Sequence, residues 1–171
     1  RQGLQLLFSG GRRAVLRLSG TGTSGATLRL SILDPTGAPL EGVEVVLGDD
    51  WPSIDAQPAL LRQIFQNLII NAIKFNCSSG KRVQIDWRPV GQDRYEFCVR
   101  DNGIGIEPRY HEQIFQVFQR LHTREEYEGT GIGLAIVKKA INKLNGSIDI
   151  QSEFGKGSSF CVTLPKTQKE I

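Results

Sequence analysis

Four polar side chains recur along one side of an otherwise apolar segment, residues 58–75. They are Gln63, Asn67, Asn71 and Lys74, at spacings of four, four and three residues. An α-helix turns by about 100° per residue, so these side chains fall on one narrow stripe. Amides and an ammonium group are costly to bury without partners, which predicts that the stripe faces a ligand or a polar cavity. The alternative is the solvated face of an ordinary amphipathic helix.

A glycine-rich turn, residues 101–105, directly follows an expected strand and has the sequence Asp-Asn-Gly-Ile-Gly. Glycine lets the backbone turn sharply and approach a ligand closely. An ionised Asp101 at the strand end can accept a hydrogen bond from an amino-bearing base such as adenine. The alternative is a plain turn, because Asn-Gly is a strong turn signal by itself.

A second glycine-rich segment, residues 129–134, opens an expected helix and reads Gly-Thr-Gly-Ile-Gly-Leu. Free backbone N–H groups at a helix N-terminus form an anion site, for which phosphate is the usual guest. The segment is not a Rossmann fingerprint, because a polar loop precedes it, and it lacks the Lys-Ser/Thr of a Walker A loop. Together, the stripe and the two turns predict a base site, a metal site and a phosphate site in one chain.

The elements that position these residues follow from apolar periodicity and turn signals. Strands are predicted over residues 14–18, 43–47, 83–87, 95–100, 147–152 and 159–164. Helices are predicted over 58–75 and 109–118, and from the second glycine-rich segment to about residue 144. Residues 27–33 fit either a strand or a short helix, and Asp55 is the expected N-cap of the first helix. This order predicts an α+β fold, a two-layer sandwich in which a mixed, largely antiparallel sheet of about five strands packs against about three helices.

Composition narrows the class of protein. A chain of 171 residues suits one globular domain, and its net charge of +3 is spread among interleaved acidic residues, which argues against nucleic-acid binding. No apolar run is long enough to span a membrane. Cys77, Cys98 and Cys161 are far apart and odd in number, which favours thiols in a reducing, cytoplasmic compartment over a disulfide framework or a zinc site. Because the first residue is Arg1, we expect a piece of a longer protein.

These segments together resemble the ATP-binding catalytic domain of sensor histidine kinases, which is grouped with gyrase, heat-shock chaperone and mismatch-repair ATPases. The similarity extends over about residues 43–165. Residues 67–75 match the N box of that family, and residues 101–105 match its first glycine box. Residues 114–120 match the F box and residues 129–134 the second glycine box. Residues 155–160 match the closing glycine motif. The run 120–131 is most similar to phytochrome-type light-sensing histidine kinases.

The resemblance implies a Bergerat-type ATP-binding fold over residues 14–165, with residues 1–13 as an upstream region or linker and 166–171 as a polar tail. It also implies that Asn71 ligates Mg²⁺ through its amide oxygen, with Asn67 as a neighbouring metal or phosphate contact. Lys74 would pair with phosphate oxygens.

Further roles follow from the same resemblance. Asp101 would bind the adenine amino group, and Gly103 and Gly105 would let the backbone approach the base. Arg120 would reach the γ-phosphate, and residues 107–128 would form a lid. The second glycine box would bind the phosphates of ATP through Gly129, Thr130, Gly131, Gly133 and Leu134.

Asn67 separates the branches of this superfamily. The hydrolysing relatives have a Glu at this position, which activates the attacking water, whereas an Asn cannot act as a general base. A simple ATPase is therefore disfavoured. The chain is expected to hold ATP for a histidine elsewhere and to act mainly by positioning and charge stabilisation.

The acceptor histidine of the family is missing from this chain. Its two histidines, His111 and His122, lack the required helical context. We therefore expect a monomeric fragment of a histidine kinase that cannot autophosphorylate alone. Its partner would be a helical dimerisation and phosphoacceptor domain of the same protein and, indirectly, a response regulator. The alternative is a nucleotide-binding regulatory module with little kinase activity or with net phosphatase output, which the atypical residues 1–42 suggest.

Overall fold

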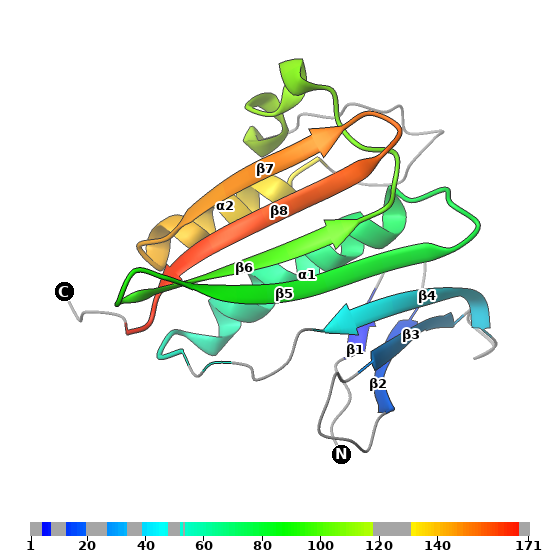
Figure 1. The fold of residues 1–171 in the computed structure, drawn as a ribbon, viewed down its shortest axis with the longest axis horizontal. Coiled ribbons are helices and arrows are strands. Elements are labelled where there is room, and N and C mark those ends of the chain that lie inside the picture. Colours follow the sequence, from blue (N-terminus) through cyan, green and yellow to red (C-terminus); the bar gives the residue numbers. More distant parts are fainter. Residues whose placement is uncertain are drawn as a thin grey trace.

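The computed structural model describes residues 5–7, 13–19, 27–33, 39–47, 52, 54–117 and 131–167. Up to residue 47 only the backbone is described, apart from the side chain of Val46. The described strands form one sheet of eight strands in the order β1-β2-β3-β4-β5-β6-β8-β7 (Figure 1). Their bounds are β1 Gln5–Leu7, β2 Arg13–Ser19, β3 Thr27–Leu33, β4 Pro39–Leu47, β5 Lys81–Val90, β6 Arg94–Asp101, β7 Ser147–Glu153 and β8 Gly157–Pro165.

The sheet is mixed but largely antiparallel. The β4–β5 pair is parallel, while the other neighbouring pairs are antiparallel. Two helices, α1 (Pro58–Lys74) and α2 (Gly133–Lys143), cover one face of β5–β8 (Figure 1). The α+β sandwich predicted from the sequence is confirmed. The expected number of about five strands falls between the four that the helices cover and the eight of the whole sheet.

The core lies between the two helices and the inner face of these four strands. Alternate residues of β8 are buried because successive side chains point to opposite faces of a strand. Apolar residues fill the space from both layers, including Ile64, Leu68 and Ile73 of α1, Val137 and Ile141 of α2, and Val83, Phe97, Val99, Phe160, Val162 and Leu164 of the strands. This packing fixes which side of α1 faces away from the sheet, and so where its polar stripe lies.

The start of α1 differs from the prediction. Its N-cap is Gln57 rather than Asp55, and no side chain caps the helix there. Pro58 occupies the first turn, where a missing N–H costs nothing because that group has no partner inside the helix. Asp55 instead joins the end of the chain: its backbone N–H donates to the carbonyl of Lys166 at 2.9 Å. Tertiary pairing has replaced a local cap.

Two shorter segments resolve or correct the sequence reading. Residues 27–33, which fitted a strand or a helix, form strand β3 between β2 and β4. The helix predicted over residues 109–118 is wrong for its described part, which forms two 3₁₀ turns, η1 (Pro108–Tyr110) and η2 (Gln113–Phe115). Only Ile114 is buried in these turns, and so short a segment gains too little from one anchor to complete an α-helix.

The cysteine prediction is also wrong. Cys98 of β6 and Cys161 of β8 form a disulfide, with Cα atoms 4.1 Å apart. The sheet register places the two residues directly opposite each other. They are 63 residues apart in the chain, so their pairing depends on which strands become neighbours. Within the described residues, no helix is long and apolar enough to cross a bilayer.

Candidate nucleotide-binding site

The polar stripe of α1 lies beside the start of α2. Gln63 is exposed, while Asn67, Asn71 and Lys74 are partly buried. The Asn67 amide donates a hydrogen bond to the backbone carbonyl of Gln63 at 2.8 Å. A Cβ added to Gly133 would lie 3.0 Å from Oδ1 of Asn67. The N box and the second glycine box, far apart in the chain, therefore meet here, and glycine keeps the space open.

The N-terminus of α2 offers backbone donors that have no acceptor inside the helix. Ile132 is the N-cap and provides no side-chain hydrogen bond. The first helical bond at this end runs from the Ile136 N–H to the Ile132 carbonyl, at 3.0 Å. The N–H groups of Gly133 and Leu134 precede that bond and have no acceptor inside the helix. Gly131, with φ of 71°, adopts the left-handed conformation that turns the chain into this helix.

Asp101 ends β6 and accepts two backbone hydrogen bonds on Oδ1. The donors are the N–H of Gly103 at 2.8 Å and the N–H of Ser158 at 3.3 Å. The Asp101–Ser158 pair belongs to the β6–β8 register. Two strands and the first glycine turn thus fix the carboxylate, and Oδ2 is left to accept a further donor.

Burial raises the pKa of Asp101 to about 6, although the N–H groups of Gly103 and Ser158 act to lower it. Removing a carboxylate from water disfavours its charged form, whereas hydrogen bonds donated to it favour that form. At neutral pH the side chain is mainly ionised and is poised to accept an amino hydrogen. A shifted pKa in a partly buried position is typical of functional sites.

Gly103 and Gly105 have different structural reasons to be glycine. A Cβ on Gly103 would lie 2.3 Å from the Phe75 carbonyl oxygen, at the end of α1. A Cβ on Gly105 would lie 1.9 Å from the Glu153 carbonyl oxygen, and its φ is 67°. The first glycine box is therefore packed tightly between the end of α1 and the β7–β8 turn. This packing holds Asp101 in place.

The sequence reading did not identify Asn76 and Asn102 as a pair. Asn76 is 2% exposed, and its amide donates to Oδ1 of Asn102 at 2.8 Å. Oδ1 of Asn102 also accepts from the backbone N–H of Arg82 at 2.8 Å. The Asn102 amide donates to the Gly80 carbonyl at 2.8 Å. The only sequence signal for this network was the presence of two asparagines beside the predicted boxes.

A hydroxyl network in the β7–β8 hairpin supports the same turn and was likewise missed. Oγ of Ser152 accepts the backbone N–H of Ile106 at 2.8 Å and donates to the Gly157 carbonyl at 3.0 Å. The Ser158 hydroxyl lies 2.8 Å from Oγ of Ser152. Because the Ser152 proton is directed at Gly157, Ser158 is the donor in this pair. Through these hydrogen bonds the closing glycine motif supports the first glycine box.

The described part of the F box packs on α2. Ile114 is buried, and the Lys138 ammonium lies 5.7 Å from the centroid of the Phe115 ring. His111 is not free in the lid, since its Nε2 lies 3.1 Å from the Ile106 carbonyl. Arg120, His122, Gly129 and Thr130 lie outside the described residues.

The site satisfies the chemical requirements of Mg²⁺ and a nucleotide. Amide oxygens such as those of Asn67 and Asn71 are hard ligands of the type that Mg²⁺ accepts alongside phosphates and water. Gly133 leaves open the space beside Oδ1 of Asn67. The structure brings Asn67 close to α2, and places Asp101 at the other glycine turn that adjoins the end of α1.

Comparisons with known proteins decide the family. A family model described as histidine kinase-, DNA gyrase B-, and HSP90-like ATPase matches residues 56–168, well over half of the chain. The chain belongs to this family. A second model, for the C-terminal domain of phosphoglucomutase-1, matches residues 1–36 only. The resemblance stated from the boxes alone is confirmed, and family membership implies ATP binding.

Similar proteins include the phytochrome-like protein Cph1 of Synechocystis, 47% identical over 124 residues, which is 72% of this chain and 16% of Cph1. Cyanobacterial phytochrome A of Nostoc is 47% identical over 122 residues, 71% of this chain and 16% of that protein. A crystal structure of full-length ShkA in complex with AMPPNP has a TM-score of 0.62 and 28% identity, covering 74% of this chain and 26% of that one. The chain thus spans about a sixth of the curated relatives' length.

Proposed function

We propose that this domain binds Mg·ATP and donates the γ-phosphoryl group to a histidine on a separate helical domain of the same protein. The observation that carries the proposal is the fixed carboxylate of Asp101. Within the described residues both of its hydrogen bonds fall on Oδ1, so Oδ2 can accept the adenine amino group. A base held there places the phosphates toward the stripe of α1 and the start of α2.

The phosphate end of the proposed site combines three kinds of group. Asn71 and Asn67 supply amide oxygens to Mg²⁺, and Lys74 supplies a positive charge to phosphate oxygens. The second glycine box supplies backbone groups to the phosphates at the start of α2, from Gly129, Thr130, Gly131, Gly133 and Leu134. Arg120 approaches the γ-phosphate from the lid, residues 107–128. Bound Mg²⁺ would neutralise part of the triphosphate charge.

The chain's own contribution to the reaction is positioning. A nitrogen of the acceptor histidine attacks the γ-phosphorus, the bond to the β–γ bridging oxygen breaks, and ADP leaves. Asn67 cannot remove a proton from water, which limits wasteful hydrolysis. Most of the rate enhancement then comes from alignment and charge stabilisation, as is usual for phosphoryl transfer.

The proposal includes the rest of the protein. The kinase domain extends over residues 14–165, with 1–13 as a linker and 166–171 as a tail. It acts in the cytoplasm. The fragment alone is a monomer, the acceptor domain of the same protein supplies dimerisation, and a response regulator receives the phosphoryl group. The small share of each curated relative that the chain spans supports the need for further domains.

The test supplies the acceptor domain of the full-length protein separately, together with Mg·ATP and this chain. Phosphohistidine is expected on the acceptor and none on the chain alone. Asp101→Asn and Asn71→Ala are expected to abolish transfer, whereas Asn142→Ala, at an exposed position of α2, serves as the matched control and retains it.

Other outcomes assign the alternatives. Nucleotide binding without transfer would favour the regulatory module, which residues 1–42 motivate because the family model begins only at residue 56. Steady phosphate release without an acceptor would identify an ATPase and contradict the role given to Asn67. Failure to bind Mg·ATP would overturn both the kinase and the regulatory module.

A further inference from the structure

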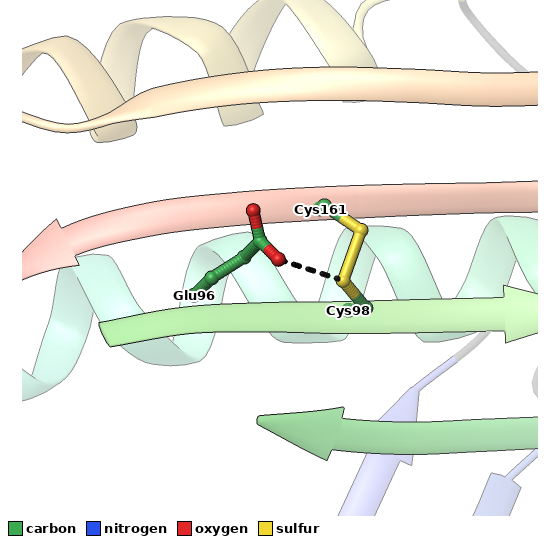
Figure 2. A group of neighbouring side chains, drawn as sticks. All are labelled: Glu96, Cys98 and Cys161. Atoms are coloured by element: carbon green, nitrogen blue, oxygen red, sulfur yellow. Dashed lines mark hydrogen bonds between the residues drawn. A yellow bond between two sulfur atoms is a disulfide. The ribbon is translucent and has the colours of Figure 1, made fainter. Parts of the chain in front are cut away.

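A cluster of metal-ligating side chains lies on the face of the sheet opposite the helices. Phe97 and Val99 are buried in the core, and the Phe97 ring packs against Phe65 of α1 with centroids 5.7 Å apart. Side chains alternate along β6, so Glu96 and Cys98 point to the other face. Figure 2 shows them beside Cys161 of β8, with the helices behind the strands.

The three side chains are close enough to share one ion. One ligand atom from each of Glu96, Cys98 and Cys161 lies within 4.8 Å of the others. Sγ of Cys98 is 3.9 Å from Oε1 of Glu96 (Figure 2). Tetrahedral zinc, with bonds of about 2.3 Å to sulfur and about 2.0 Å to oxygen, needs ligand atoms about 3.5–3.8 Å apart. Small side-chain rotations meet that requirement once the disulfide is open.

We propose that, in its reduced state, the Cys98–Cys161 pair forms with Glu96 a binding site for a thiophilic divalent cation of the Zn²⁺ class. A dithiol reductant supplies two electrons and two protons to the disulfide and becomes a disulfide itself. The two thiols formed then lose their protons to solvent as two sulfur–metal bonds form. The Glu96 carboxylate is the third ligand, and water takes the fourth position.

The three ligand side chains are largely shielded from solvent. Cys98 is 3% exposed, Cys161 is partly buried and the Glu96 side chain is 15% exposed. The β6–β8 ladder holds both cysteines opposite each other, so little conformational freedom is lost when an ion binds. Disulfide and metal-bound dithiolate are thus alternative states of one preorganised pair.

Arg88 competes with the metal for Glu96. Its Nε lies 2.5 Å from Oε1 of Glu96, and its side chain is 71% exposed. The guanidinium can therefore swing into solvent when an ion takes the carboxylate. Removing this positive charge should tighten metal binding, an effect that a merely structural role for Glu96 does not predict.

The experiment titrates the full chain with Co²⁺ after reduction by a phosphine and removal of the reductant. A sulfur-to-cobalt charge-transfer band is expected at one equivalent, with loss of the band when Zn²⁺ is added. The oxidised chain is expected to show no band. Absence of the band in the reduced chain would overturn the proposal.

Matched variants locate the site. Cys98→Ser and Cys161→Ser should each lose at least half of the band, Glu96→Gln should raise the Kd for Co²⁺, and Arg88→Gln should lower it. Cys77→Ser is the control, because this third cysteine is exposed and lies elsewhere, at the end of α1. A band that persists unchanged in Cys161→Ser, or disappears in Cys77→Ser, would refute the site. If a cysteine variant fails to fold, the opposite changes in Kd expected for Glu96→Gln and Arg88→Gln still test the site.

Discussion

The side-chain amide of Asn76 donates a 2.8 Å hydrogen bond to Oδ1 of Asn102, across 26 residues of sequence. Asn76 follows Phe75, the C-cap of α1, and Asn102 follows the adenine-binding candidate Asp101. The bond therefore ties the helix that carries the metal and phosphate candidates to the turn that carries the base candidate. Oδ1 of Asn76 also accepts the Ser78 N–H at 3.1 Å, so both ends of this buried amide are used.

Asn76→Ala is expected to lower the free energy of unfolding by about 1–3 kcal/mol, because the change removes the hydrogen bonds that this buried amide makes with Asn102 and Ser78. Nucleotide affinity should fall with it, since the first glycine turn loses its anchor. Urea unfolding and nucleotide titration measure the two effects. Asn142→Ala, at an exposed position, should change stability by less than about 0.5 kcal/mol. Equal effects of the two substitutions would contradict the role of Asn76.

Asp101→Asn is expected to stabilise the nucleotide-free domain at neutral pH while it weakens ATP binding. The folded protein raises the pKa of Asp101 from 3.8 to about 6. Between those values the folded state binds more protons than the unfolded state, so the contribution of Asp101 to stability falls as the pH rises. The asparagine does not titrate and should escape this loss, which amounts to at most about 3 kcal/mol at about 1.4 kcal/mol per pKa unit.

Denaturant unfolding of both proteins from pH 4 to pH 8, without nucleotide, measures this difference. The stability gap should widen between pH 4 and about pH 6 and remain constant above that range. Asn142→Ala, at an exposed position of α2 that carries no titratable group, is the matched control and should show no such widening. A gap that is independent of pH would show that burial does not raise the pKa of Asp101.

Gly105→Ala is expected to destabilise the domain far more than Gly91→Ala. Both glycines have positive φ, 67° and 61°, so each substitution incurs a backbone cost of about 1 kcal/mol. Only at Gly105 does the new Cβ meet another atom, the Glu153 carbonyl oxygen at 1.9 Å, while nothing lies within 4 Å at Gly91. Thermal unfolding of the two variants separates the backbone cost, which both share, from the cost of the clash at Gly105. Similar losses would show that the first glycine turn is not tightly packed.

Replacement of both Cys98 and Cys161 by Ala is expected to lower the free energy of unfolding of the oxidised protein. The disulfide closes a loop with a sequence separation of 63 residues, for which chain entropy gives about 4 kcal/mol. In the presence of reductant the difference should shrink markedly. Cys77→Ala should leave stability nearly unchanged under both conditions. A double variant as stable as the oxidised parent would show that the cross-link adds nothing.

Local patterns were sufficient for much of the candidate site. The spacing of Asn67, Asn71 and Lys74 required a helix with a polar stripe, and the glycines near Asp101 required a sharp turn. Both conclusions rest on backbone geometry within a few residues. Asn67 of the stripe lies beside Gly133. Roles toward metal and phosphate remain predictions.

Two local predictions failed, for different reasons. Asp55 was expected to cap α1, yet its backbone pairs with Lys166, far along the chain. Residues 109–118 had enough apolar spacing for a helix, but their described part settles as two 3₁₀ turns. At Asp55 a weak local preference, worth about 1 kcal/mol or less, yields to a tertiary contact. The segment after residue 108 has only Ile114 buried, which is too little to complete an α-helix.

The sequence by itself determined the family, the α+β class and the polar stripe, because periodicity and glycine turns are local properties of the chain. The tertiary structure alone decided the Cys98–Cys161 disulfide, the Asn76–Asn102 bond and the Ser152–Ser158 support of the glycine turns. Each depends on the β5-β6-β8-β7 strand order, which no local pattern encodes. Strand neighbours are selected by how the whole core packs, and a shift of one residue in register would turn strand side chains such as those of Cys98 and Ser152 to the other face.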